Sequence, residues 1–407
     1  MAANLRDRLN RIRELKNIEA ALKTEKPSHN DDSCLTLVGW ESCGFKTVKR
    51  EVTVASPFKS MKSLPAALSI LVPDLKGREL PSLDDFLFFD LETTGLSGGA
   101  GTLAFLAAFG KPAGRKLRIT QYLLLDYPGE NDFLDLLLAE FKNENSVIVS
   151  YNGKCFDSQV LKTRCLMNRM KPPEYFHADL LHPSRRLWKS IINDCSQGSV
   201  EARILRIYRE NDIPGALAPD IWFEFLKTGR TERLFGICDH NIFDIAGLSS
   251  ILAAMINIAS DPLGCEEPVF DLERLALYWR DFLRRNAPNS ELQITGFELL
   301  RRAAEKKYPR AVLAYAQETM KKGDYQKGRK ILVKISESEF PLNIKLQALR
   351  TLAIDSERRQ QNIAASVEFA DHALKLANEG AWKNEFLRRK ERLEKKLNLI
   401  ENRLFII

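Results

Sequence analysis

Cysteine pairs are missing from this sequence. Seven cysteines occur in 407 residues, an odd number, and they are scattered without any CxxC spacing. That pattern argues against both a disulfide framework and a zinc cage, which need paired or closely spaced cysteines. We therefore expect reduced thiols in a cytoplasmic protein.

Long hydrophobic runs are also scarce. The arginines near the N-terminus are interrupted by Asp7 and Glu14, and no apolar segment follows them, so this stretch does not have the pattern of a signal peptide. The longest apolar helical run begins at Ile245 and is too short and too polar to span a bilayer. We therefore expect no membrane partner.

No excess of one charge covers the whole chain. Residues 267–407 hold 28 Lys and Arg against 20 Asp and Glu, whereas residues 1–266 hold 33 against 34. The basic excess of the C-terminal third is typical of an electrostatic footprint for a polyanion, but also of an ordinary solvated helical surface. The sequence leaves both interpretations open.

The chain does contain a run of alternating element signals after residue 82. We predict strands at 83–93, 102–110, 116–126, 145–153 and 174–182, helices at 130–143 and 155–170, and further helices to residue 258. The apolar run of the first strand is nearly continuous, which indicates burial on both faces. This order of elements predicts a mixed α/β sheet flanked by helices.

The last part of the chain has a helical pattern throughout. Residues 307–335 have the layout helix, tight turn, helix, and the same layout returns 38 residues later. Such pairs resemble tetratricopeptide repeats, whose usual period is about 34, with Gly328 and Ser366 at the small-residue packing position. The resemblance implies a helical-repeat domain with a possible protein partner.

These patterns divide the chain into three expected parts. Residues 1–81 have no assigned role; they begin with an amphipathic helix over residues 1–24 and continue as an irregular region with short strand-like pieces such as KREVTVA. Residues 82–258 form the α/β domain, and residues 262–407 form the helical-repeat domain.

Two carboxylates stand at the exit of the first predicted strand. Asp90 and Glu92 are two residues apart, so they point to the same face, roughly 7 Å apart along the backbone. Paired carboxylates on a buried face repel each other, and a divalent metal would resolve that conflict. The alternative is a strand tip at which both side chains reach water. The tripeptide by itself does not decide between the two.

Three further polar residues occur on the predicted helices. Asp157 falls in the first turn of the helix after a Tyr-Asn-Gly turn, where the helix dipole favours a carboxylate in any case. His240 and Asp244 are four residues apart, hence on one face of an otherwise apolar helix. Taken alone, such a pair is explained as well by a satisfied core histidine and a surface aspartate.

In this order the motifs resemble those of the DEDD, or DnaQ-like, 3′–5′ exonucleases of the ribonuclease H-like fold. FFDLETTGL, YNGKCFD and HNIFD are close to the family's three motifs, and the resemblance covers residues 82–258. SGGAGT, HADLLHPSRRLW and ENDIPG look like the YprB-type predicted exonucleases, a branch that often carries C-terminal tetratricopeptide-like repeats.

The resemblance implies a metal-dependent 3′–5′ exonuclease acting on DNA or RNA. Asp90, Glu92, Asp157 and Asp244 would bind two divalent ions, Mg²⁺ or Mn²⁺, for in-line attack on a phosphodiester. His240 would accept a proton from the attacking water. Its spacing departs from the family, whose histidine-type members have HxxxxD and whose tyrosine-type members have YxxxD, because this chain has HxxxD.

Some other residues are weaker candidates for substrate binding. They are Thr93, Thr94, Asn152, Lys154, Arg185 and Arg186. The threonines would place backbone N–H groups near the terminal nucleotide or would only form a turn, and the basic residues would contact phosphate. Lys154 is explained equally well as an exposed loop residue, and Arg186 as the partner of a nearby carboxylate.

Two other functions remain compatible with the sequence. One is a nucleic-acid-binding or scaffold protein whose helical repeats recruit partners and whose nuclease-like domain is weak. The presence of all four carboxylates favours catalysis over that scaffold. The other is an endonuclease acting on branched or hybrid duplexes, since ribonuclease H-like folds host several nuclease types.

Overall fold

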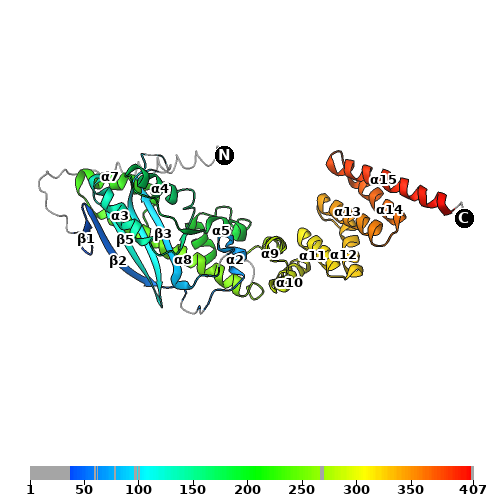
Figure 1. Cartoon of the computed structure of the whole chain (residues 1–407), viewed down its shortest axis with the longest axis horizontal. Coiled ribbons are helices and arrows are strands. Elements are labelled where there is room, and N and C mark those ends of the chain that lie inside the picture. Colours follow the sequence, from blue (N-terminus) through cyan, green and yellow to red (C-terminus); the bar gives the residue numbers. More distant parts are fainter. Residues whose placement is uncertain are drawn as a thin grey trace.

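The computed structural model describes residues 37–404, except residues 59–60, 62, 78, 96–98, 100 and 266–269. Figure 1 shows an elongated molecule, with a sheet and its covering helices at one end and an arm of helices at the other. The helix predicted over residues 1–24 lies outside the described residues, as does Cys34. The cysteines in the described part of the chain are free thiols.

A mixed sheet forms one end of the molecule. Its strands are β1 (Glu41–Gly44), β2 (Thr47–Ala55), β3 (Phe86–Thr93), β4 (Ala104–Ala113), β5 (Lys116–Leu124), β6 (Val147–Ser150) and β7 (Phe176–Asp179). They lie in the order β1-β2-β5-β4-β3-β6-β7. Because β3 is antiparallel to β4 and parallel to β6, the predicted mixed α/β sheet is confirmed.

Two strands of this sheet come from the region before residue 82, to which the sequence assigned no role. β2 pairs with β5 over its whole length, from Thr47 opposite Leu124 to Ala55 opposite Lys116, and β1 pairs with β2. Much of β2 alternates between exposed and partly buried residues, as expected for a strand with one face in water. Residues 41–44 and 47–55 therefore belong to the same sheet as the strands after residue 82.

Helices cover the sheet. They are α2 (Leu68–Leu71), α3 (Glu130–Glu140), α4 (Asp157–Met167), α5 (Leu181–Trp188), α6 (Gln197–Val200), α7 (Ala218–Thr228) and α8 (Glu232–Ser260). Short turns connect them: the 3-10 turns η1 (Pro73–Leu75), η2 (Leu83–Asp85), η3 (Tyr127–Gly129) and η5 (Gly215–Leu217), and the π-helical turn η4 (Glu201–Leu205). The strand predicted over residues 174–182 is shorter than expected, because β7 ends at Asp179. Helix α5 follows and holds Pro183 in its first turn, where proline is tolerated.

Helix α8 packs directly on the sheet. A Cβ atom at Gly110 of β4 would lie 2.4 Å from Ile245 Cγ2, so the glycine lets the helix approach closely. The helix begins at Glu232, and by length and composition it would suffice to cross a membrane. The sequence prediction counted the apolar helix only from Ile245 and therefore underestimated its length. A mostly buried core helix passes the same test, and the contacts of α8 with β3 and β4 are those of a core helix.

The arm consists of helix pairs. Its described helices are α9 (Leu272–Asn286), α10 (Leu292–Glu305), α11 (Pro309–Lys321), α12 (Tyr325–Glu337), α13 (Leu342–Arg358), α14 (Ile363–Leu376) and α15 (Ala381–Leu404). The two predicted helix-turn-helix units are present as α11–α12 and α13–α14. A Cβ at Gly328 would lie 2.3 Å from Met320 Cγ, and the buried Ser366 donates to the Ala353 carbonyl at 2.8 Å. Both small residues thus allow the helices to pack closely.

The arm shares its core with the sheet. One hydrophobic cluster runs from Phe88 of β3 through α8 to Trp279 of α9 and on to α10 and α11. At the same junction the guanidinium of Arg186 lies over the ring of Tyr278, 4.6 Å from its centroid. The core is therefore continuous across residue 262, where the sequence placed the start of a separate domain.

A chain that ends after residue 262 is expected to be insoluble when expressed. It would lack Leu275, Trp279 and Leu283, each no more than 2% exposed in the intact protein. Burying each such side chain contributes about 1.5–3 kcal/mol, so the loss approaches the whole stability of an ordinary domain, about 5–15 kcal/mol. The control is a chain that ends after residue 340 and keeps α9 to α12. A soluble, cooperatively melting 1–262 fragment would show that the shared core is dispensable.

Candidate active site

Four acidic side chains meet at the end of β3. Asp90 and Glu92 lie on that strand, Asp157 is the first residue of α4, and Asp244 lies on α8. The charges of the other three all act on Asp90, so these side chains are close in space. The structure thus brings together the four carboxylates that the sequence singled out.

The turn before α4 holds Asp157 in place. Asn152 has a left-handed backbone with a φ of 67°, and a Cβ at Gly153 would lie 2.9 Å from Asp157 Oδ2, so the close approach requires glycine. Asp179, at the end of β7, accepts the backbone N–H groups of Asn152 at 2.8 Å and Lys154 at 3.1 Å. The Tyr-Asn-Gly turn is therefore fixed from the neighbouring strand and presents Asp157 to the site.

A chain of buried amides holds Asp90. Asn241 Nδ2 on α8 donates to Asp90 Oδ2 at 2.7 Å. Asn241 Oδ1 accepts from Gln121 Nε2 of β5 at 2.8 Å, and Gln121 Oε1 accepts from Arg50 Nε of β2 at 2.7 Å. Both amides are fully buried, and their hydrogen bonds satisfy them there. The region before residue 82 thus supports the site through Arg50.

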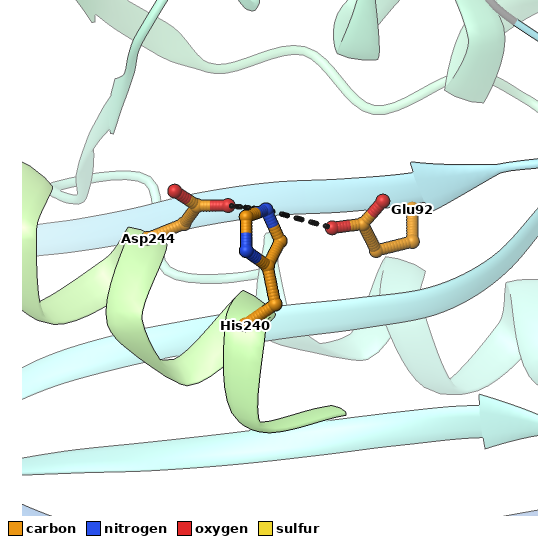
Figure 2. Close-up of side chains that lie close together, drawn as sticks. All are labelled: Glu92, His240 and Asp244. Carbon is orange, nitrogen blue, oxygen red and sulfur yellow. Dashed lines mark ion pairs between the residues drawn. The ribbon is translucent and has the colours of Figure 1, made fainter. Parts of the chain in front are cut away.

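The imidazole of His240 lies between Glu92 and Asp244 (Figure 2). Its Nε2 atom is 3.2 Å from Asp244 Oδ2 and 4.0 Å from Glu92 Oε1. Ligand atoms of the three side chains lie within 4.8 Å of one another. His240 and Asp244 share one face of α8, as their spacing predicted.

An arginine binds the other oxygen of Asp244. Arg209 Nη2 donates to Asp244 Oδ1 at 2.8 Å, and two nitrogens of the same guanidinium donate to the buried Glu201 at 2.7 Å each. Asp212 accepts from His240 Nδ1 at 2.7 Å and from Arg209 Nη1 at 3.3 Å. These charge-assisted bonds connect the loop after η4 to two residues of the site.

Burial and mutual repulsion disturb the ionisation of the first three carboxyl groups. Burial, followed by the neighbouring negative charges, raises the pKa of Asp90 well above its ordinary value. Burial raises the pKa of Glu92 to about 8, although the charge of His240 opposes this, and it raises the pKa of Asp157 to about 7. Such groups ionise fully at neutral pH only if positive charge is brought to them.

His240 and Asp244 stabilise each other's charged form. Burial acts to lower the pKa of His240, but the hydrogen bond and charge of Asp244 outweigh it and, with Glu92 and Asp212, raise that pKa to about 9. Burial acts to raise the pKa of Asp244, but His240 and Arg209 outweigh it, and the pKa is lowered. At neutral pH the two residues therefore form an imidazolium–carboxylate pair.

The donor set suits a divalent cation that prefers oxygen ligands. Carboxylates from a strand and two helices converge, and three of them have raised pKa values that a cation would relieve. Glu92, His240 and Asp244 are close enough together to hold an ion. Mg²⁺ and Mn²⁺ commonly use a few carboxylates together with water and substrate oxygens.

Thr93, the last residue of β3, and Thr94, which follows it, have a structural part in the turn. Thr93 Oγ1 donates to the Gly95 carbonyl at 2.8 Å. Thr94 donates its N–H to the Leu103 carbonyl at 2.8 Å, and its Oγ1 accepts the Leu103 N–H at 2.9 Å. Both contacts support the interpretation of these residues as turn formers.

The basic candidates come from the segments before and after β7 in the chain. Lys154 Nζ is 2.7 Å from Asp74 Oδ1, so this lysine is ion-paired. Arg186 packs on Tyr278 and donates to the Leu71 carbonyl at 3.4 Å, which makes it part of the junction with α9. Arg185 is exposed on α5. A phosphate contact for any of them stays a prediction.

Sequence reasoning missed several residues of the site. Asn241 and Gln121 were not predicted, because the role of a buried amide depends on contacts that the sequence does not show. An asparagine in the apolar stretch after His240 was nevertheless a signal. Arg209 and Glu201 had no motif to mark them. Asp212 falls within ENDIPG, a stretch that drew attention only by resemblance.

Comparisons with known proteins bear on the same part of the chain. Residues 87–256 match the model of a family described as RNase_H superfamily. The uncharacterized protein YprB of Bacillus subtilis (strain 168) is 39% identical over 175 residues, which span 42% of this chain and 42% of YprB. The match therefore spans less than half the length of that relative.

A solved structure is also similar, though weakly. The family B DNA polymerase of the hyperthermophilic archaeon Pyrobaculum calidifontis aligns with 49% of this chain and 29% of its own, at 15% identity and a TM-score of 0.34. The family match and the mixed sheet with its covering helices identify the part of the chain that holds the acidic site as an RNase H-like domain.

Proposed function

We propose that this chain is a metal-dependent 3′–5′ exonuclease that hydrolyses phosphodiester bonds of DNA or RNA. The observation that carries the proposal is the convergence of Asp90, Glu92, Asp157 and Asp244. A buried group of carboxylates costs folding stability unless a cation is bound, and strongly perturbed pKa values mark functional sites. The RNase H-like domain supports the nuclease class.

The chain's own residues would set the direction of the ligand oxygens. Asn241 fixes one oxygen of Asp90, and Arg209 fixes one oxygen of Asp244, so the second oxygen of each has a defined position. Two divalent ions, when bound, would activate a water molecule and stabilise the leaving oxygen of an in-line attack.

His240 is the proposed general base. In the metal-free protein the neighbouring carboxylates hold it protonated, and a protonated imidazole cannot accept a proton. A cation that neutralises Asp244 and Glu92 would remove the main causes of the raised pKa, and the imidazole would become available as a base. The position of Nε2 among the ligand oxygens supports this role at the HxxxD spacing.

The direction and mode of cleavage are tested with substrates of two kinds. Purified protein and Mn²⁺ are incubated with DNA and RNA strands labelled at the 5′ end, with the 3′ end either free or blocked. A ladder that forms only from free 3′ ends is expected. Cleavage of the blocked strands would replace the exonuclease by an endonuclease, and binding without cleavage would leave a scaffold whose arm recruits partners.

A further inference from the structure

A segment between the π-helical turn and α7 covers one side of the candidate active site. It runs from Arg209 to Gly215, and it contacts α8 at three successive points. A Cβ at Gly236 would lie 2.2 Å from Ile213 Cδ1, Asp212 bonds to His240, and a Cβ at Gly215 would lie 2.8 Å from His240 Nε2. We call residues 209–215 the strap, because it lies across the histidine of α8.

The strap fixes which nitrogen of His240 faces the carboxylates. An imidazole that rotates by a half turn about its last torsion exchanges nitrogen and carbon atoms on each edge. Asp212 Oδ1 accepts from Nδ1 at 2.7 Å, and this bond selects the orientation in which Nε2 points to Glu92 and Asp244. The side chain of His240 is only 14% exposed, so little room remains for another orientation.

Asp212 is itself held by the strap's arginine. Arg209 Nη1 lies 3.3 Å from Asp212 Oδ2, while the rest of the guanidinium is bound by Glu201 and Asp244. Glu201 is buried against Gly247 of α8, where a Cβ would come within 1.8 Å of its Oε1. Through Arg209 and Glu201, Asp212 is therefore supported by α8, the same helix that carries His240.

We propose that Asp212 is a positioning residue that holds the His240 imidazole with Nε2 directed at the metal ligands. The proposal rests on the exonuclease function and adds to it a residue outside the four proposed metal ligands. A carboxylate that orients a histidine through its second nitrogen is a common support in metal and hydrolytic sites, and its loss there costs about 10- to 100-fold in activity. The strap thus acts on catalysis through the histidine.

The test is a double-mutant cycle in the full-length protein. Asp212→Ala is expected to lower kcat about 10- to 100-fold with KM little changed. In a His240→Ala background the same change is expected to cost less than about twofold, because the group on which Asp212 acts is gone. Glu210→Ala, an exposed acidic residue of the same strap, is the matched control and should stay within about twofold of wild type.

A second readout does not depend on activity. The ¹⁵N resonances of the His240 ring are assigned in metal-free, histidine-labelled protein by their loss in His240→Ala, which is practical with five histidines in the chain. Asp212→Ala is expected to shift the Nδ1 resonance and Glu210→Ala to leave it in place. Mn²⁺ affinity of Asp212→Ala, from a binding titration, should remain within about threefold of wild type, since no metal ligand changes.

Three outcomes would overturn the inference. They are unchanged His240 resonances in Asp212→Ala, unchanged kcat, or an Asp212→Ala loss that persists in full when His240 is absent. An inactive wild-type protein would instead contradict the proposed function. In that case the resonance measurement still decides whether Asp212 orients the ring.

Discussion

Replacing Asp90 by asparagine is expected to lower Mn²⁺-dependent turnover by about 10³-fold or more, while making the metal-free protein more stable. The activity falls because the metal ions supply several kcal/mol of charge stabilisation in such reactions, and each 1.4 kcal/mol is about tenfold in rate. The fold is expected to persist, because asparagine has the shape of aspartate and can still accept the bond from Asn241. Turnover is measured on 5′-labelled strands, and stability by chemical unfolding at pH 8.

The gain in stability is the more discriminating half of this prediction. Burial and the neighbouring carboxylates raise the pKa of Asp90 well above its ordinary value, so its negative charge is unfavourable in the folded metal-free state. Removing that charge should therefore raise the free energy of unfolding of the apo-protein at pH 8. Glu51→Gln, an exposed acidic residue on β2, is the control for a surface charge. A destabilised Asp90→Asn protein would contradict the electrostatic account of the site.

Stabilisation by Mn²⁺ is expected to grow as the pH rises from about 5 to about 8. Metal binding must displace the protons that the carboxyl groups retain in the folded apo-protein, and fewer remain at higher pH. The pKa of Asp157 is raised to about 7 and that of Glu92 to about 8. Thermal unfolding with and without saturating Mn²⁺, at several pH values in this range, measures the effect.

The metal-free protein should show the opposite trend. Unfolded carboxyl groups have pKa values of about 4, so between pH 4 and 8 the folded state of Glu92 or Asp157 binds more protons than the unfolded state. Their contribution therefore falls as the pH rises through this window and is constant above it. His240, with a pKa raised from 6.5 to about 9, contributes stability below pH 6.5 that is lost as the pH rises to 9.

Measurements at the acidic end of this pH range separate the contribution of the carboxyl groups from that of His240. Between pH 4.5 and about 5.5, His240 is mostly protonated in both states. Burial lowers the pKa of His177 to about 4, so the contribution of His177 rises with pH there, and a net loss of apo-stability in this range comes from the carboxyl groups. Asp157→Asn should reduce that loss and should remove most of the Mn²⁺ effect. An Mn²⁺ shift in melting temperature that is the same at pH 5.5 and pH 8, or that survives in Asp157→Asn, would exclude the proposed metal site.

The central strand and the four carboxylates could be predicted because each has a local signature. The apolar run of β3 indicates burial on both faces, and it is buried except at Asp90, which is partly exposed. The place of β1 and β2 at one side of the sheet could not be predicted, although KREVTVA within β2 has a strand-like pattern. β2 alternates weakly, with charged residues at Lys49, Arg50 and Glu51, and its place in the sheet depends on pairing with β5, which lies far along the chain.

The supports of the site could not be read from the sequence for a related reason. Arg209 and Asp244 are 35 residues apart, and their bond depends on how the π-helical turn and the strap cross α8. A buried arginine leaves no periodic pattern, because its burial is made possible by its partners and not by its neighbours in the chain. The continuity of the core across residue 262 was hidden likewise, because amphipathic helices have the same pattern whether they cover a sheet or each other.

The shared core between the sheet and α9 has a geometric consequence. If a flexible tether joined the arm to the sheet, the arm would sample many orientations. A molecule bound to the arm would then lie near the acidic site only part of the time. Because the hydrophobic core is continuous through the junction, the start of the arm instead has a fixed orientation relative to the sheet. If the arm binds a partner, as proposed, a molecule docked on α11 would be held at a set distance and angle from Asp90, and the arm would select which point of that molecule reaches the acidic site.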